Sequence, residues 1–208
     1  MHKSIDNLAV INNQIKQKFG SIDKVNIIAV SKTFPKEEIE PLIQHGHIHF
    51  GENKVQEAIE KWTKIKASLN HIRLHMIGKL QTNKVKYVVP LFDYIHSLDN
   101  VKLAEKISIE QQKRKKNLKI FIQVNIGEEE QKSGIDEKNL MNFYYTCTNE
   151  LKLNIVGLMC LPPKDSNVNT YFERMALLKK STGVKELSMG MSADYVKAVE
   201  FGASYLRI

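Results

Sequence analysis

Residues 27–33 read Ile27-Ile28-Ala29-Val30-Ser31-Lys32-Thr33, an apolar run that passes directly into a polar turn. Four consecutive apolar residues are typical of a strand that is covered on both faces of a parallel sheet. Phe34-Pro35 then breaks the pattern before a helical stretch begins. Lys32 therefore follows the carboxyl end of a predicted strand, and the fold depends on how often this strand-turn-helix unit recurs.

The unit recurs along the whole chain, after an amphipathic helix predicted over 4–19 and ended by Gly20. Strands are predicted over 25–31, 47–50, 72–77, 92–97, 118–126, 153–160, 185–189 and 203–208. Helices are predicted over 36–45, 53–68, 82–89, 100–115, 136–149, 167–181 and 192–201. Eight alternating units favour a closed barrel over a doubly wound open sheet, which is the alternative. We therefore expect an α/β fold, with residues 1–208 forming a single (β/α)8 TIM barrel domain and an extra N-terminal helix.

The composition is that of an ordinary globular protein and argues against nucleic acid and membranes as partners. The net charge is +8, but the only dense basic run, Lys113-Arg114-Lys115-Lys116, ends a predicted helix, where cations complement the helix dipole. We therefore expect no nucleic-acid partner. No apolar run approaches the roughly 18 residues of a membrane span. Two isolated cysteines favour a cytoplasmic location, and we expect a monomer.

In a barrel of this kind, functional residues lie at the carboxyl ends of the strands, where Lys32 is predicted. A lysine in a partly dry cavity can lose its proton, and the neutral amine can form a Schiff base with a carbonyl. The alternative is a lysine that extends into solvent, which its position alone favours.

The segment Ser188-Met189-Gly190-Met191-Ser192-Ala193-Asp194 joins the seventh predicted strand to a helix. Gly190 allows a close backbone approach, and Ser192 is suited to be the helix N-cap. In barrels the loops after strands seven and eight often bind phosphate. A plain N-cap without a ligand is the alternative.

Arg207 lies near the end of the eighth predicted strand. If it points inward it needs an anion or a ring acceptor, whereas strand alternation could instead direct it outward. Together, Lys32, Ser192 and Arg207 outline a site for pyridoxal 5′-phosphate, with an aldehyde for the lysine and a phosphate for the serine.

The chain resembles the pyridoxal-phosphate homeostasis protein family, whose barrel is similar to the N-terminal domain of alanine racemase. The matching runs include Ala29-Val30-Ser31-Lys32-Thr33, Phe50-Gly51-Glu52-Asn53, His75-Met76-Ile77-Gly78-Lys79-Leu80-Gln81, Gly157-Leu158-Met159, Leu187 to Asp194 and Leu206-Arg207-Ile208. The resemblance implies that Lys32 holds pyridoxal phosphate as a Schiff base and that Ser192 helps to hold the phosphate. It also implies cofactor-binding roles for the remaining members of the predicted site, Asn53, His75, Met159, Ser188, Gly190 and Arg207.

The resemblance further implies a non-catalytic role in vitamin B6 homeostasis, with pyridoxal-phosphate-dependent client enzymes as partners. A racemase needs acid–base groups on both faces of the substrate α-carbon, and no second, β-rich domain is visible here. A small amino-acid racemase that uses Tyr195 or His75 is the alternative. We expect no metal site, because no carboxylate or cysteine joins His45, His47 and His49.

Members of the family usually continue past the final Arg-Ile pair into a glycine-containing loop and a last helix. The sequence printed here ends at Ile208, so the barrel is C-terminally short by comparison. Because that loop normally supplies backbone N–H groups to the phosphate, we expect weaker cofactor binding than in a relative that has it.

Overall fold

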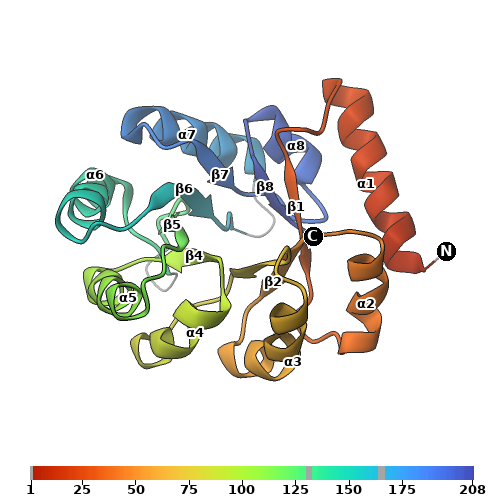
Figure 1. Ribbon diagram of the computed structural model, residues 1–208. Coiled ribbons are helices and arrows are strands. Elements are labelled where there is room, and N and C mark those ends of the chain that lie inside the picture. The colour runs from red at the N-terminus through yellow and green to blue at the C-terminus, as the bar shows by residue number, and fades with distance from the viewer. Residues whose placement is uncertain (1, 130–132, 164–166) are drawn as a thin grey trace.

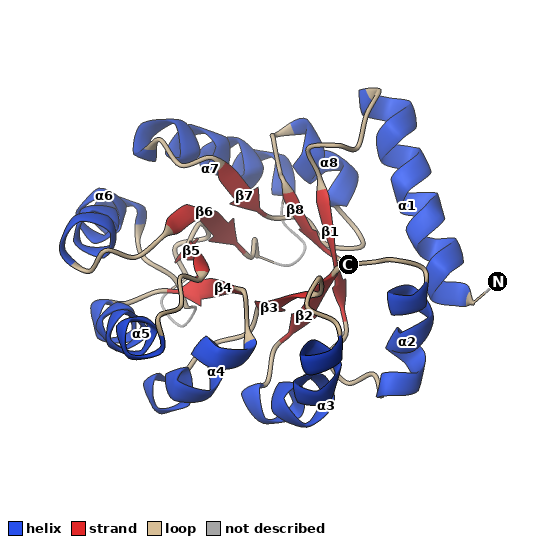
Figure 2. Ribbon diagram, viewed as in Figure 1, coloured by secondary structure: helices blue, strands red, loops and turns tan. Residues whose placement is uncertain are grey.

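The computed structural model describes residues 2–129, 133–163 and 167–208, and within them parallel strands form a closed barrel surrounded by helices (Figures 1 and 2). The strands are β1 (Asn26–Val30), β2 (His49–Glu52), β3 (Arg73–Met76), β4 (Tyr94–Leu98), β5 (Lys119–Val124), β6 (Ile155–Cys160), β7 (Glu186–Ser188) and β8 (Tyr205–Arg207). The helices are α1 (Lys3–Phe19), α2 (Lys36–Gln44), α3 (Val55–Ser68), α4 (Val85–Leu91), α5 (Val101–Arg114), α6 (Glu137–Tyr145), α7 (Val168–Thr182) and α8 (Tyr195–Glu200). A 3-10 turn, η1 (Thr82–Lys84), precedes α4, and a π-helical turn, η2 (Thr146–Glu150), follows α6.

The strand order closes the sheet, because β1 pairs with β2 on one side and with β8 on the other. Ala29 lies opposite Phe50, and Ile28 lies opposite Arg207. The prediction of a (β/α)8 barrel with an extra N-terminal helix is confirmed, and the open-sheet alternative is wrong. That extra helix, α1, packs against α2 and α8 on the outside of the barrel (Figure 1). In the described part of the chain, none of the helices has the length and apolar character to cross a lipid bilayer.

One strand begins later than the sequence pattern indicates. The predicted strand 47–50 is β2, which starts at His49, because the preceding residues still complete the end of α2. Gly46 adopts φ +90°, and the amide of His47 donates to the carbonyl of Leu42 at 2.9 Å. This left-handed turn ends the helix, and it engages the amide of His47, which is then not available to the sheet.

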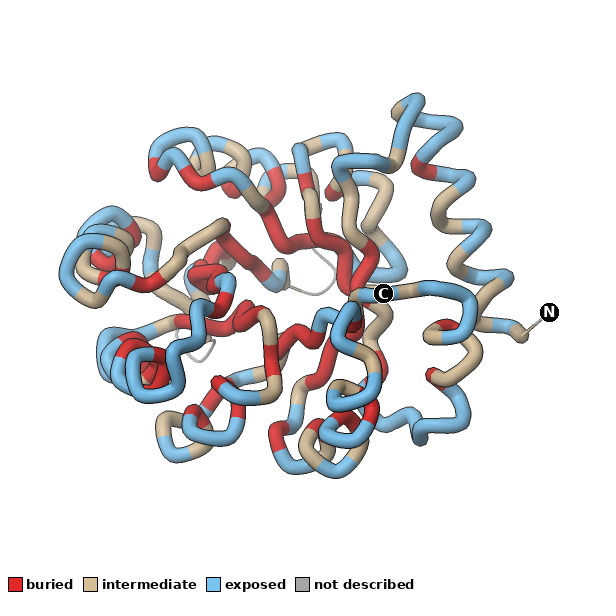
Figure 3. The backbone as a smooth tube through the Cα atoms, in the orientation of Figure 1, coloured by how far each residue is buried: buried red, intermediate tan, exposed pale blue. Residues whose placement is uncertain are grey.

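Burial concentrates on the strands and on the helix faces that cover them (Figure 3). A large apolar cluster fills the space between sheet and helices. A second cluster fills the inside of the barrel and consists of Ile28, Tyr94, Phe121, Met159 and Tyr205. The barrel is therefore packed through its interior, and open space for a ligand must be sought at the ends of the strands.

A buried carboxylate joins the end of β2 to α3 and to the loop after β1. Glu52 is fully buried, and its Oε1 accepts hydrogen bonds from Ser31 Oγ at 2.9 Å and from Trp62 Nε1 at 2.8 Å. Lys61 Nζ lies 2.9 Å from the same oxygen and supplies the opposite charge. The charge-assisted bonds offset the cost of removing a carboxylate from water.

The loop that carries Lys32 is fixed from both sides by α3. Lys61 Nζ donates to the carbonyl of Ser31 at 2.7 Å, and the amide of Thr33 donates to Glu57 Oε1 at 2.6 Å. Thr33 adopts φ +66°, a left-handed backbone conformation that residues other than glycine adopt only with strain. These bonds hold the strained turn in place and therefore determine where the intervening Lys32 begins.

We predict that Glu52→Gln lowers the free energy of unfolding by about 3 kcal/mol, because it removes the closer and fully buried of the two carboxylates that pair with the nearly buried Lys61 ammonium. Urea denaturation monitored through Trp62 fluorescence measures this loss. Glu60→Gln is the matched control on the same helix. Glu60 is exposed, and its side chain accepts a hydrogen bond from Gln56 one turn earlier. Equal stabilities of the two variants would show that the Glu52 charge is dispensable.

Candidate functional site

Lys32 lies in the turn at the carboxyl end of β1 and is exposed. Its neighbour Ser31 points outward, since its hydroxyl bonds Glu52 between the sheet and α3. Successive side chains of an extended chain alternate, so Lys32 begins on the opposite side, toward the mouth of the barrel. The predicted position at a strand end is confirmed, whereas the predicted partly dry surroundings are not found in this structure.

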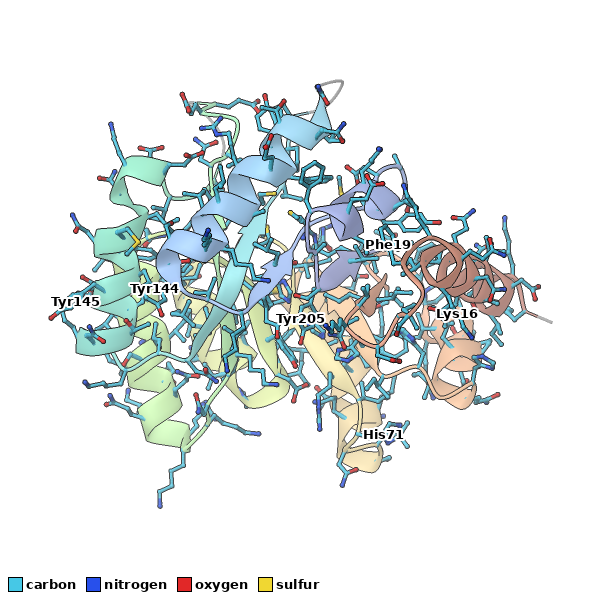
Figure 4. All side chains as sticks on the ribbon, turned by 90° about the horizontal axis from the view of Figure 1, so that it is seen from above. Lys16, Phe19, His71, Tyr144, Tyr145 and Tyr205 are labelled. Atoms are coloured by element: carbon cyan, nitrogen blue, oxygen red, sulfur yellow. The ribbon has the colours of Figure 1, made fainter. Side chains whose placement is uncertain are left out.

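Arg207 points into the barrel from β8 and is buried. Its Nη1 donates to Ser188 Oγ at 2.7 Å, and its Nη2 donates to the carbonyl of Cys160 at 2.8 Å. The outward alternative is wrong, because Arg207 lies on the same strand face as Tyr205 (labelled in Figure 4), which belongs to the buried cluster inside the barrel. Burial lowers the pKa of the Arg207 guanidinium, although a guanidinium stays charged at neutral pH.

Three histidines form a hydrogen-bonded line that ends at the same serine. His49 Nδ1 lies 2.9 Å from His75 Nε2, and His75 Nδ1 lies 2.9 Å from His96 Nε2. His96 Nδ1 in turn lies 2.9 Å from Ser188 Oγ. His75 is therefore buried inside the barrel, below the mouth, and its link to the predicted site runs through His96 and Ser188.

The turn between β7 and α8 departs from the sequence prediction. Ser192 is not the N-cap: α8 begins at Tyr195, the N-cap is Asp194, and Ser192 is exposed in the turn before it. The reason is that Asp194 Oδ1 accepts from the amide of Met191 at 2.6 Å and closes the turn itself. Within the described residues, the amides of Ser192 and Ala193 donate to no other group, so two N–H donors stay open beside Gly190.

Gly190 adopts φ +94°, and a Cβ built there would lie 2.6 Å from the Cβ of Ala198. A larger residue is therefore excluded at this position by both conformation and space. The glycine lets the turn pass tightly over α8, and its carbonyl accepts from the amide of Arg207 at 3.0 Å. The turn and the arginine are thus joined through the backbone.

Two further predicted residues lie on neighbouring strands. Met159 is fully buried in the interior cluster and lies opposite Ser188 in the sheet register. Asn53 follows β2, and its backbone packs so closely on Gly78 that a Cβ there would lie 2.3 Å from the Asn53 carbonyl oxygen. The side-chain oxygen of Asn53 is buried and has no hydrogen-bond partner among the described residues.

Some of the predicted site residues are thus linked by hydrogen bonds, whereas others are not linked to them. Ser188, Gly190, Arg207 and His75 are linked by hydrogen bonds, and Met159 is their neighbour on β6. Lys32 makes no hydrogen bond or ion pair to any of them in the described structure. Sequence reasoning missed His96 and the anchor formed by Glu52 and Lys61. The alternation of Tyr94 and His96 on β4, with both side chains inward, was the available signal for the first.

The residues at the mouth fit an anionic ligand that also has a ring acceptor. Arg207 has five N–H donors, and the two hydrogen bonds described above leave others available. The open amides of the turn after Gly190 suit a phosphate, and the unpartnered oxygen of Asn53 suits a donor on a ligand. Pyridoxal phosphate presents groups of each kind, so the residues present fit it.

Comparison with known proteins agrees with the kind of ligand that the site residues fit. The family model described as alanine racemase, N-terminal domain, matches residues 5–208. The pyridoxal phosphate homeostasis protein of Pasteurella multocida is 33% identical over 208 residues, which cover 95% of this chain and 89% of that protein. The protein of the same name from Vibrio alginolyticus is 35% identical over 219 residues, covering 97% and 93%.

Among solved structures, PipY of Synechococcus elongatus PCC7942 with pyridoxal phosphate bound superposes with a TM-score of 0.80. It is 32% identical in sequence, and the match covers 93% of this chain and 97% of that chain. Fold, motifs and near-complete coverage agree, and the chain belongs to the family of pyridoxal phosphate homeostasis proteins, which share the barrel of the alanine racemase N-terminal domain.

Proposed function

We propose that this chain binds pyridoxal 5′-phosphate at the carboxyl end of its barrel and acts in the homeostasis of that cofactor. The observation that carries the proposal is the buried Arg207–Ser188 pair, held at the mouth of a barrel whose relative PipY has been solved with pyridoxal phosphate bound. A buried cation with spare donors needs an acceptor, and this cofactor supplies a pyridine nitrogen and a phosphate.

In the proposal Lys32 attaches the cofactor covalently through its amine. When bound, the cofactor supplies an aldehyde carbon that a lysine can attack. The turn from Ser31 to Thr33 fixes the start of the Lys32 side chain. This turn directly follows β1, the strand that pairs with β8. The exposed state of Lys32 leaves it accessible to an incoming ligand, as a protein that takes up and releases a cofactor requires.

The phosphate is assigned to the turn after Gly190. The open amides of Ser192 and Ala193, together with the Ser192 hydroxyl, offer donors to an anion. Because Ser192 is not the helix cap, its proposed role is in ligand binding rather than in fold stability. Asn53 and Met159 are proposed to border the ring, and Ser188 to support Arg207.

Two observations favour a carrier over the alternative amino-acid racemase. The Tyr195 hydroxyl donates to Gln14 Oε1 of α1 on the outside of the barrel, so this tyrosine is engaged away from the mouth. His75 is fully buried, and both its ring nitrogens are paired with other histidines. Neither proposed base is free to reach a substrate α-carbon. The partners that follow from a carrier role are enzymes that require the same cofactor.

We predict that borohydride reduction of the protein mixed with pyridoxal phosphate fixes the cofactor on Lys32, because no other residue is proposed to form the covalent bond. Peptide mass spectrometry locates the label. Lys79→Ala is the matched control, since Lys79 is another exposed lysine just after a barrel strand. Label that persists at equal level in Lys32→Ala would refute the assignment.

We predict that Ser192→Ala weakens pyridoxal phosphate binding about tenfold, as expected for one lost hydrogen bond to a charged group. Its urea midpoint should stay unchanged, because Ser192 is exposed and caps no helix. Pyridoxal without the phosphate is the matched ligand, and its affinity should be insensitive to the substitution. A similar loss for both ligands would assign Ser192 a role other than phosphate binding.

We predict that the protein loaded with pyridoxal phosphate does not racemise alanine. The α-proton of alanine should exchange with solvent deuterium only slightly faster than it does with free pyridoxal phosphate. A positioned general base would accelerate the exchange by roughly 100-fold or more. Proton NMR and chiral chromatography measure exchange and enantiomer formation. Rapid racemisation that disappears in Lys32→Ala would replace the carrier with an enzyme.

A further inference from the structure

A line of imidazole rings crosses the inside of the barrel from its amino-terminal end toward the proposed cofactor site. It starts at His49, the first residue of β2, which is half-buried, and continues through His75 on β3 and His96 on β4. It ends at Ser188 Oγ on β7, which also accepts from Arg207. The proposed function uses only the Ser188 end of this line.

The rings are held in place by aromatic neighbours. His75 stacks on Tyr94 with ring centroids 4.1 Å apart and an interplanar angle of 16°. His96 stacks on Phe121 with centroids 4.3 Å apart and an angle of 15°. Since the stacks restrict rotation, each nitrogen keeps the same neighbour, and the line can change only through the positions of its hydrogens.

The interior rings are neutral. Burial, followed by the neighbouring imidazole of His96, holds the pKa of His75 well below its usual range. Burial, followed by the charge of Arg207, does the same for His96. Burial lowers the pKa of His49 to about 4, with smaller contributions from His47, Arg73 and Lys119 that Asp93 partly opposes. At neutral pH each ring therefore has one N–H donor and one acceptor nitrogen.

One donor and one acceptor per ring allow only two arrangements of the whole line. Either every ring carries its hydrogen on Nδ1 and donates toward Ser188, or every ring carries it on Nε2 and donates toward His49. Mixed arrangements would place two donors or two acceptors face to face, which is costly for buried groups. The line is thus a two-state element.

The serine links this choice to the ligand. Arg207 has only donors, so one lone pair of Ser188 Oγ is always taken. In the Nε2–H state the Ser188 hydroxyl donates to His96. In the Nδ1–H state it accepts from His96, and its own hydrogen is free to point at a ligand. A ligand acceptor at Ser188 therefore favours the second state.

We propose that His49, His75 and His96 are a tautomer relay, which couples ligand binding at Ser188 and Arg207 to the protonation pattern of His49 at the opposite end of the barrel. The proposal rests on the proposed cofactor site for its ligand. Its physical basis is the unbroken line of three contacts of 2.9 Å between groups that can each reverse donor and acceptor roles.

The hydrogen balance of the switch is complete. The Ser188 hydroxyl hydrogen passes to His96 Nδ1, that of His96 Nε2 to His75 Nδ1, and that of His75 Nε2 to His49 Nδ1. The hydrogen of His49 Nε2 leaves to solvent, and Ser188 takes one from solvent at the mouth. One proton enters, one leaves, and no charge stays in the core.

The relay can be tested by nitrogen NMR of histidine-labelled protein at neutral pH, because ring nitrogen shifts distinguish the two tautomers. Addition of pyridoxal phosphate should raise the Nδ1–H fraction at His96, His75 and His49 together. In His75→Phe, which keeps a ring at the Tyr94 stack, His96 should still respond while His49 no longer does. His47→Phe is the matched control and should respond like the unaltered protein, since the His47 ring bonds backbone groups of His49 and Ile27 and none of the rings in the line.

Should His75→Phe fail to fold, Ser188→Ala tests the other end and should abolish the response of all three rings. Borohydride labelling on Lys32 in the same samples reports whether the cofactor binds at all. In the unaltered protein, binding without any change of tautomer would overturn the relay, and so would a response of His49 that survives in His75→Phe or Ser188→Ala. Absence of binding in the unaltered protein would instead refute the proposed function.

Discussion

The position of Lys32 depends on one carboxylate, that of Glu52, in a place from which water is excluded. A buried charge is tolerated only with partners of good geometry, and Glu52 has three on a single oxygen: Ser31 after β1, and Lys61 and Trp62 of α3. These bonds orient the strand end, the turn and the helix toward one another. The same demand for charge compensation keeps Lys61 on the inner face of α3, where it also fixes the carbonyl before Lys32.

The barrel was predictable because its information is local and repeated. Apolar stretches such as Ile27 to Val30 indicate strands, and periodic apolar faces indicate helices, so the alternation of the two predicts eight units. The boundaries were less predictable, since they depend on hydrogen bonds between distant or competing groups. Asp194, whose side chain bonds the amide of Met191, takes the N-cap position of α8 in place of Ser192, and the closing turn of α2 delays β2 to His49. The pattern of a single sequence does not show which of several possible hydrogen bonds will form at the end of a helix or strand.

For the candidate site, position was predictable and environment was not. The order of predicted strands and helices placed Arg207 and Lys32 at the carboxyl ends of their strands. The partners of Arg207, and those of the residues on either side of Lys32, come from other elements of the chain. The fold is that of the alanine racemase N-terminal domain. A shared barrel does not by itself specify a reaction, because catalysis depends on the side chains that the strand ends present.

The buried histidines also determine how the molecule withstands acid. His47, His49, His75 and His96 all have pKa values lowered by burial, whereas in an unfolded chain they would titrate near 6.5. Between that value and their folded pKa values, the unfolded chain binds more protons than the native one. Stability is therefore fully present above about pH 6.5 and is lost progressively as the pH falls. The same imidazoles that pack the barrel as neutral rings at neutral pH therefore become a source of instability in acid, because they can take up protons only when the barrel opens.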